Sequence, residues 1–198
     1  MGARDKLVAS AIDLMRRHGI AGTGIAQLLE ASGVSRRSVY LSFPGGKAEL
    51  VAEATRVAGE AYSALMRTVT AGADVATCVA AYPAMWRETM LASNFTAGCP
   101  IVHAALSRAE APAAADAAQR TFAEWEEILA ERLRAEQVDP DTARSLATTI
   151  IAAVEGAVVL SLAERSEAPL ERTAKHLAEL IAQHTRQTTI DLSGYVAP

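Results

Sequence analysis

The sequence predicts an all-α protein in which three short N-terminal helices precede a larger helical body. Hydrophobic residues make up 51% of the 198 residues, with Ala the most frequent of them, whereas aromatic residues make up only 5%. This composition suits helices better than sheets. Apolar residues recur at helical spacing in every long segment, and no segment between turn signals alternates with period two over six residues. We therefore expect no β-sheet.

The N-terminal residues predict three helices in order. An apolar stripe at helical spacing forms the first, which ends before Gly19 because glycine favours the left-handed backbone at a helix C-terminus. A second helix is expected over Ile25–Ala31, with Thr23 as its N-terminal cap. Ser35 is expected to cap a third helix over about 36–42.

Six further helices are expected after these three. Glycine, proline and short polar segments mark the breaks between them. The expected ranges are 47–69, 74–93, 100–108, 114–136, 141–164 and 169–187. The Ala-rich segment 111–118 is expected to be a loop that leads into a helix, and the tail 187–198 is expected to fray.

Charge is distributed unevenly along the chain. Residues 1–50 carry seven Lys and Arg against four Asp and Glu, whereas the rest of the chain carries twelve against nineteen. The net charge of −4 argues against a uniformly basic nucleic-acid-binding protein. A small basic part joined to an acidic body indicates an anionic partner for the N-terminal part alone.

The second and third helices are joined by only three residues, Ser32-Gly33-Val34, which is helix-turn-helix spacing. Val39 and Phe43 lie four residues apart and are expected to face the core, so the basic and hydroxyl side chains face outward and fit a DNA major groove. The candidate DNA-contacting residues are Thr23, Ser35, Arg36, Arg37, Ser38, Tyr40, Ser42 and Lys47. Taken alone, this pattern also fits a solvated basic helix.

The spacing of the whole N-terminal string is more specific. It resembles the signature of the TetR family of bacterial transcriptional repressors at Gly19, Thr23, Ile25–Leu29, Gly33-Val34-Ser35, Val39-Tyr40, Phe43 and Lys47. Two positions depart from the family pattern, because Ser42 stands where His is common and Arg37 where Gly or Ala is common. Both lie on the groove-facing helix, so no operator sequence can be transferred from a relative.

Three further features resemble the LmrA/YxaF-like subgroup of that family. They are the segments 43–47 and 98–101, and Trp125. The resemblance spans about residues 3–187 and is strongest over 18–54. It implies homodimers that leave DNA when a small, often aromatic or lipophilic, molecule occupies the C-terminal domain. It also implies control of nearby genes for efflux pumps or modifying enzymes.

Aromatic and methionine side chains gather in the middle of the chain. They fit either an ordinary helical core or an apolar ligand cavity. We expect a cavity, because both Trp residues of an aromatic-poor chain fall here. Its expected lining is Met66, Trp86, Met90, Phe95 and Trp125, with His103 or Arg87 as the polar group.

Cys99 and His103 lie four residues apart, a spacing that suits two metal ligands or a nucleophile and its base. No third ligand of suitable spacing accompanies them, so we expect no metal, no cofactor and no catalytic residue. A small helical enzyme or a redox sensor that uses Cys99 and His103 stays open as an alternative, since a helix N-terminus lowers the pKa of a thiol.

The last two expected helices carry apolar residues at nearly every fourth position. This pattern suits a four-helix interface between two copies of the chain, and it also suits the core of one monomer. We expect the interface, formed by Leu146, Ile150, Val154, Val158, Leu177 and Ile181.

A cytoplasmic protein without a membrane partner is expected. Two cysteines make no disulfide framework, and the N-terminus lacks the apolar region and cleavage site of a signal peptide. The longest apolar run, 147–163, is interrupted by Glu155.

We therefore expect a helix-turn-helix DNA-binding domain over 1–47, called the head below, and a ligand-binding and dimerisation domain over 48–198, called the body. The expected function is a repressor that binds a palindromic operator as a dimer and is released by a small apolar or aromatic effector. A helical adaptor would dimerise without salt-dependent DNA binding, and an activator or a corepressor-dependent regulator stays open.

Overall fold

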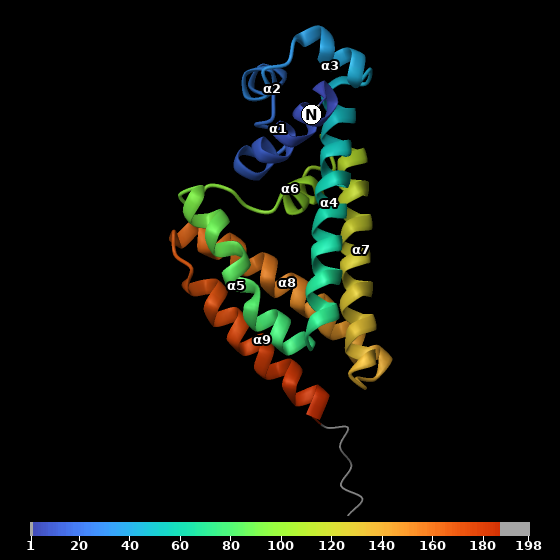
Figure 1. The fold of residues 1–198 in the computed structure, drawn as a ribbon, viewed down its shortest axis with the longest axis vertical. Helices are drawn as coiled ribbons and strands as arrows, with labels where there is room; N and C mark the ends of the chain where they lie inside the picture. The colour runs from blue at the N-terminus through green and yellow to red at the C-terminus, as the bar shows by residue number, and fades with distance from the viewer. Residues whose placement is uncertain (1, 187–198) are drawn as a thin grey trace, which may run out of the picture.

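The computed structural model describes residues 2–186, and all regular secondary structure within this range is helical (Figure 1). The all-α prediction is confirmed. The helices are α1 (Ala3–His18), α2 (Ile25–Ser32), α3 (Arg36–Ser42), α4 (Gly46–Gly72), α5 (Val75–Ala92), α6 (Pro100–Leu106), α7 (Pro112–Ala135), α8 (Pro140–Glu164) and α9 (Ala168–Arg186). The tail 187–198, for which fraying was expected, lies outside the described residues.

Side-chain caps determine where several helices begin. The Ser35 hydroxyl accepts a hydrogen bond from the Ser38 amide at 3.2 Å and starts α3. Asp74 accepts one from the Thr77 amide at 2.8 Å and starts α5. Asp139 accepts hydrogen bonds from the Asp141 and Thr142 amides and starts α8, which has a proline in its first turn. Because these bonds are local, the starts of these helices could be predicted closely from the sequence.

Two local expectations are wrong. Gly24 rather than Thr23 occupies the cap position of α2, because the Thr23 hydroxyl is used elsewhere. The segment 112–118 is the first part of α7 rather than a loop. Ala114 and Ala118 are fully buried there, so small side chains let α7 pack closely against its neighbours.

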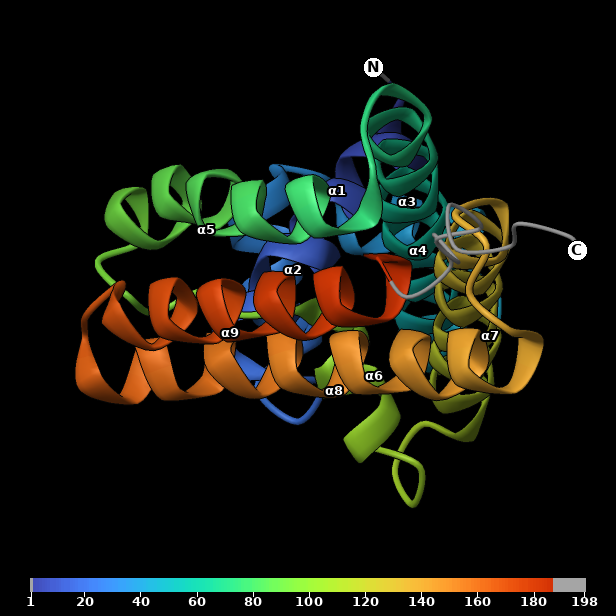
Figure 2. The same ribbon diagram turned by 90° about the horizontal axis from the view of Figure 1, so that it is seen from below.

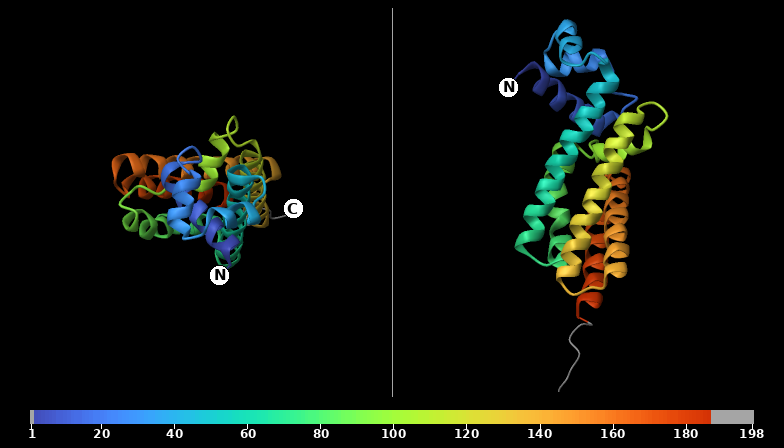
Figure 3. Two further views of the ribbon diagram at one scale, coloured as in Figure 1. Left: turned by 90° about the horizontal axis from the view of Figure 1, so that it is seen from above. Right: turned by 90° about the vertical axis from the view of Figure 1, so that its right-hand side faces the viewer.

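The body has two groups of helices. The long helices α4 and α7 run side by side along the length of the molecule, as Figure 1 and the right-hand view of Figure 3 show. Helices α5, α9 and α8 follow one another as layers, with α9 in the middle, which Figure 2 shows from below. The head lies at one end, where α1 packs against α4 and α6.

One apolar core is continuous between the head and the body. Fully buried Leu7, Val39 and Phe43 of the head belong to the same cluster as Leu50 and Val51 of α4. A second cluster fills the far end of the body between α5, α7, α8 and α9. Because packed apolar side chains transmit displacements, the head is mechanically joined to the adjoining part of the body.

The most apolar helix, α8, is only partly covered. It is long and apolar enough to cross a membrane, a test that a packed core helix also passes. Only 39% of its most apolar 18 residues are buried within the chain. One side of α8 packs on α7 and α9, and the other side faces outward.

Candidate nucleic-acid interface and ligand cavity

Helix α3 is held against the core by one face and leaves the other face exposed. Val39 and Phe43 are fully buried, as their spacing predicts. The guanidinium of Arg4 lies over the Phe43 ring at 4.4 Å and its Nη1 donates to the Ser42 carbonyl at 3.1 Å, so α1 fixes the end of α3. The exposed face is therefore presented on a rigid support.

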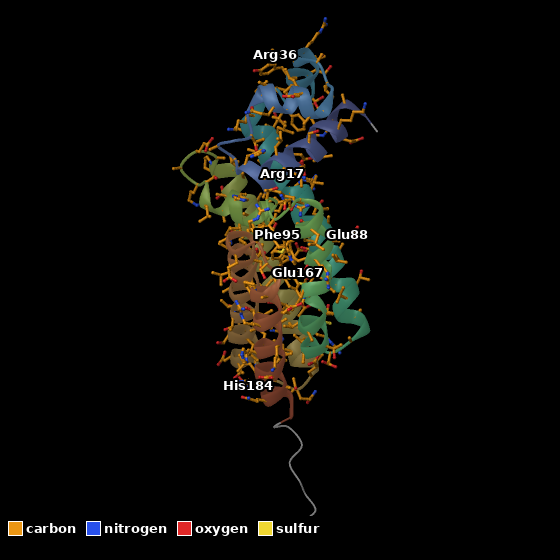
Figure 4. The ribbon with its side chains drawn as sticks, turned by 90° about the vertical axis from the view of Figure 1, so that its left-hand side faces the viewer. Arg17, Arg36, Glu88, Phe95, Glu167 and His184 are labelled. Carbon is orange, nitrogen blue, oxygen red and sulfur yellow. The ribbon has the colours of Figure 1, made fainter. Side chains whose placement is uncertain are left out.

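Arg36 and Arg37 are exposed in the first turn of α3. Neither forms a hydrogen bond or an ion pair with any other residue in the described range 2–186. Arg36 lies at the far end of the head, opposite His184 at the other end of the molecule (Figure 4). Two unpaired cations at one tip of an acidic protein are well placed to meet phosphates or guanine edges.

Tyr40 is 48% exposed and is also available on α3. Its ring lies close to Gly46, where an added side chain would meet it at 3.5 Å. The hydroxyls of Ser35 and Ser38 are hydrogen-bonded to each other at 2.9 Å at the start of the helix. Both serines lie beside the arginines, and the partly exposed Ser42 closes the same helix.

Thr23 is not available to DNA. Its side chain is fully buried, and its hydroxyl donates to the Gly19 carbonyl at 2.7 Å. A phosphate contact would leave that carbonyl without its partner, so Thr23 is removed from the candidate DNA-contacting residues.

Lys47 is engaged within the chain. Its ammonium lies 3.0 Å from the Glu110 carboxylate, which belongs to the segment between α6 and α7. The pair joins the first turn of α4 to the body, so a phosphate contact by Lys47 requires this surface ion pair to open. Such exposed pairs contribute little to stability and exchange partners readily.

The head and the loop between α5 and α6 are linked at Arg16. The Gly98 amide donates to the Arg16 carbonyl at 2.9 Å, and the Arg16 Nε donates to the Gly98 carbonyl at 3.2 Å. Arg16 lies in the last turn of α1, and Gly98 directly precedes Cys99, the cap residue of α6. Arg17 lies at the same junction in Figure 4 and reaches Thr96 at 3.3 Å.

The body contains an apolar cavity of about 190 Å³. Its walls come from α4, α5, α7 and α8, with Arg16 of α1 and Cys99 at the end nearest the head. Met66, Trp86 and Trp125 line it, as expected. Leu65 and Met85 also line it while being 44% and 41% exposed, so the cavity opens between α4 and α5.

Two tyrosines complete the aromatic wall. Tyr62 meets Trp125 edge to face, with ring centroids 6.2 Å apart and an interplanar angle of 83°. The Trp86 indole N–H donates to the Tyr82 hydroxyl. Burial raises the pKa of Tyr82 well above its usual value, so the phenol stays neutral. These rings form a dry, polarisable surface for a planar ligand.

Three expected lining residues are placed elsewhere. Met90 is fully buried in the core, and Phe95 packs against the same core from the loop after α5. His103 lies beside Gly19 and Gly98 at the junction with the head, where burial lowers its pKa. Arg87, the other expected polar group, pairs with Glu167 at 3.3 Å on the surface.

The acidic group of the cavity is Glu155 of α8, which was expected only to interrupt an apolar run. Burial raises the pKa of its carboxyl to about 7, although the neighbouring Cys99 thiol opposes the shift. Its Oε2 is buried and has no hydrogen-bond partner. The sequence does contain a signal for this acidic group, because Glu155 is the single charged residue between 147 and 163.

The alternative that used Cys99 and His103 has no support in the geometry. Cys99 is buried, and burial raises the pKa of its thiol well above the usual value, with Glu155 adding to the effect. A thiol held neutral is a poor nucleophile and a poor redox sensor. Among the described residues, no group of three or more His, Cys, Asp or Glu side chains is arranged to hold a metal.

The residues expected at a dimer interface are instead buried within one chain. This core comprises Leu146, Ile150, Val158, Leu177 and Ile181, each at most 6% exposed, and the partly buried Val154 of the cavity wall. Their periodicity reflects packing of α8 and α9 on α5 and α7, so this expectation is corrected.

The outward side of α8 carries a different stripe of small and apolar residues. We call it the outer face of α8, and it comprises Ala152, Gly156, Val159, Leu160 and Ala163, all exposed. No atom lies within 4 Å of the position that a Cβ of Gly156 would occupy. A second helix therefore has room for close approach along this face.

Comparison with known families identifies both parts of the chain. Residues 7–54 match the family model described as bacterial regulatory proteins, tetR family. Residues 75–176 match the model described as transcriptional regulator LmrA/YxaF-like, C-terminal domain. The two matches cover the head and most of the body.

Two relatives match over nearly their whole length. An uncharacterized HTH-type transcriptional regulator of Mycobacterium tuberculosis is 33% identical over 187 residues, which cover 91% of this chain and 94% of the relative. The HTH-type transcriptional regulator LmrA of Bacillus subtilis is 26% identical, with 90% of this chain and 96% of the relative covered.

Solved structures share the fold. A TetR transcriptional regulator from Chloroflexus aurantiacus has a TM-score of 0.76 at 28% identity, covering 92% of this chain and 95% of its own. A cysteine mutant of the TetR family transcriptional regulator CifR, solved with a 26 bp double-strand operator DNA, has a TM-score of 0.72 at 27% identity. That match covers 89% of this chain and 95% of the CifR chain.

Proposed function

The chain belongs to the TetR family of transcriptional regulators, and we propose that it represses its genes by binding a palindromic operator as a homodimer. A small apolar or aromatic effector that enters the cavity would release it. The proposal keeps the division into a DNA-binding head over 1–47 and a ligand-binding and dimerising body over 48–198. It places the protein in the cytoplasm, where its operator is. Members of the family are regulators rather than enzymes.

The exposed, unpaired arginines of α3 carry the DNA-binding part of this proposal. Arg36 and Arg37 have no partner within the described chain, although acidic residues outnumber basic ones overall. With Tyr40, Ser35 and Ser38 they form the solvent-accessible part of α3 and its N-terminus, which fits a major groove. The CifR complex with operator DNA supports the same role for a similar fold.

Dimerisation would use the outer face of α8. One helix-turn-helix head offers few base contacts, and two heads on a two-fold axis double them. The apolar face with room beside Gly156 suits contact with the same helix of a second copy. The two recognition helices must then match half-sites about one DNA turn, roughly 34 Å, apart.

Ligand would act on DNA binding through the walls of the cavity. Its lining includes α4, which begins in the head, and Arg16, which lies in the last turn of α1. A ligand that favours a different position of either helix changes the separation of the two heads. Operator affinity then falls by an amount that is set by the difference between the ligand's affinities for the two arrangements.

A gel-shift assay of the purified protein against its own upstream DNA tests this function. We expect a specific complex whose affinity falls steeply as salt rises, because cationic side chains replace counterions on phosphates. Arg120→Ala is a matched control for the α3 arginines, since Arg120 is exposed and unpaired on α7. An adaptor or an enzyme would show no preference for that DNA.

A further inference from the structure

Glu155 is the one acidic residue in the lining of a mostly apolar and aromatic cavity. It projects from α8, and its Oε2 is buried without a hydrogen-bond partner. Leaving a carboxylate oxygen unsatisfied in an apolar site costs free energy, and the cost is greater for the ionised form. The cavity lining therefore includes a buried carboxylate oxygen that lacks a hydrogen-bond donor among residues 2–186.

Among the described residues 2–186, no cationic side chain forms an ion pair with Glu155. Arg16 also lines the cavity, but its Nε donates to the Gly98 carbonyl, and it does not offset the effect of burial on Glu155. Among the described side chains, the Cys99 thiol is the one that lowers the pKa of the Glu155 carboxyl. A neutral thiol satisfies part of the hydrogen-bonding capacity of a carboxylate and none of its charge.

We propose that the effector is a small aromatic amine, whose ammonium group binds Glu155 while its ring packs against Tyr62, Tyr82, Trp86 and Trp125. The inference rests on the ligand-responsive function proposed above and adds the charge of the ligand. An ammonium supplies both the donors and the charge that Oε2 lacks.

The walls favour a cation on a flat body for a second reason. Tyr62 and Trp125 pack edge to face, and Tyr82 and Trp86 lie with ring centroids 6.3 Å apart. Aromatic faces attract cations, and the attraction is stronger when water is excluded. A cavity of roughly 150 Å³ holds benzene, so about 190 Å³ suits one ring with a short chain.

Binding of such a cation depends on the ionisation of Glu155. The other titratable or charged groups that line the cavity are Arg16 of α1, Tyr62 of α4, Cys78 and Tyr82 of α5, and Cys99. Burial raises the pKa of both tyrosines and both cysteines, so these groups stay neutral near pH 7. Glu155 alone changes charge between about pH 5.5 and 8.5, since the pKa of its carboxyl is about 7.

Three probes of one shape test the proposal by isothermal titration calorimetry. They are 2-phenylethylammonium, 2-phenylethanol and 3-phenylpropanoate, which are cationic, neutral and anionic. We expect the ammonium to bind wild-type protein about tenfold more tightly than the alcohol at pH 8, and the anion to bind most weakly. The preference for the ammonium over the alcohol should shrink as the pH falls to about 5.5.

Glu155→Gln removes the charge and keeps the size of the side chain. We expect the ratio of ammonium to alcohol affinity to fall to about one and to lose its pH dependence. Glu164→Gln is the matched control, because Glu164 lies on the same helix outside the cavity and pairs with Arg172 on the surface. Circular dichroism checks that both variants fold.

Three results would overturn the proposal. They are equal affinity of the wild-type protein for the ammonium and the alcohol, absence of binding by all three probes, and an unchanged ratio in Glu155→Gln. Operator binding by the wild-type chain without any probe tests the repressor function separately. If the protein binds its operator but shows no preference for the ammonium, the proposed positive charge of the ligand is refuted and the repressor function is not.

Discussion

Arg16 and Gly98 hold each other by two hydrogen bonds, one in each direction, although 82 positions separate them in the chain. The Gly98 amide donates to the Arg16 carbonyl at 2.9 Å, and the Arg16 Nε donates back to the Gly98 carbonyl at 3.2 Å. Arg16 also lines the cavity. The end of the first head helix is thus both a wall of the cavity and an anchor of the loop before α6.

Arg16→Ala tests this link. Loss of the Nε bond, which is partly buried, is expected to lower the free energy of unfolding by about 0.5–1.5 kcal/mol. Arg108→Ala is the control, because Arg108 pairs with Asp116 on the surface and such pairs contribute at most about 1 kcal/mol. Urea denaturation measures both. Equal losses in the two variants would show that the Arg16 contact is an ordinary surface interaction.

Glu155 makes stability depend on pH. The pKa of its carboxyl rises from 4.5 to about 7 on folding, so the folded state prefers the protonated form. This stabilisation is complete below about pH 4.5 and is lost as the pH rises to about 7. Above that range the buried carboxylate is left ionised.

Glu155→Gln should remove the loss of stability that the wild type shows as the pH rises. Between pH 5 and pH 8 the wild type is expected to lose about 1–3 kcal/mol of stability relative to the variant. Thermal and urea unfolding across this range measure the difference, with Glu164→Gln as the control. Parallel stability curves for wild type and Glu155→Gln would mean that the carboxyl titrates as it does in water.

Arg37→Ala and Tyr40→Ala test the groove-facing side of α3. Each is expected to weaken operator binding at least about tenfold and to leave the oligomeric state unchanged. Loss of a phosphate contact by Arg37 also lowers the slope of log affinity against log salt by about one per contact. Fluorescence anisotropy measures both quantities, with Arg120→Ala as the control of equal charge. Wild-type affinity in both α3 variants would remove this face from the interface.

Leu160→Glu tests the outer face of α8. Leu160 is 54% exposed, so the substitution is compatible with the monomer fold, but it places a charge in the proposed interface. We expect a monomer in analytical ultracentrifugation and a large loss of operator affinity. Leu106→Glu is the control, since Leu106 is an exposed leucine at the end of α6. A Leu160→Glu dimer as stable as the wild type would place the interface elsewhere.

The helices and the exposed face of α3 could be predicted because they depend on local chemistry. Asp74 and Asp139 cap helices through bonds to residues two or three positions away. Val39 and Phe43 are four residues apart, which alone determines the face of α3 that turns inward. Such signals lie within one turn of helix and need no knowledge of the neighbouring elements.

The cavity and the interface could be predicted only in part, because they depend on which helices meet. Periodicity showed that Leu146 and Ile150 would be buried, but it does not distinguish burial within one chain from burial against a second copy. Met90 and His103 are near the cavity in sequence but point into the core and toward the head. Glu155 was expected only to interrupt an apolar run, because the cavity around it is formed by helices that lie far apart in the sequence.

The most direct test of the account is the affinity of the wild-type chain for a duplex from its own upstream region, measured by anisotropy beside an unrelated duplex and the Arg37→Ala variant. We expect at least about a thousandfold preference for the upstream duplex. It should fall with rising salt and largely disappear in the variant. Equal affinity for the two duplexes, or a preference that Arg37→Ala leaves intact, would contradict the assignment of α3 as the element that reads DNA.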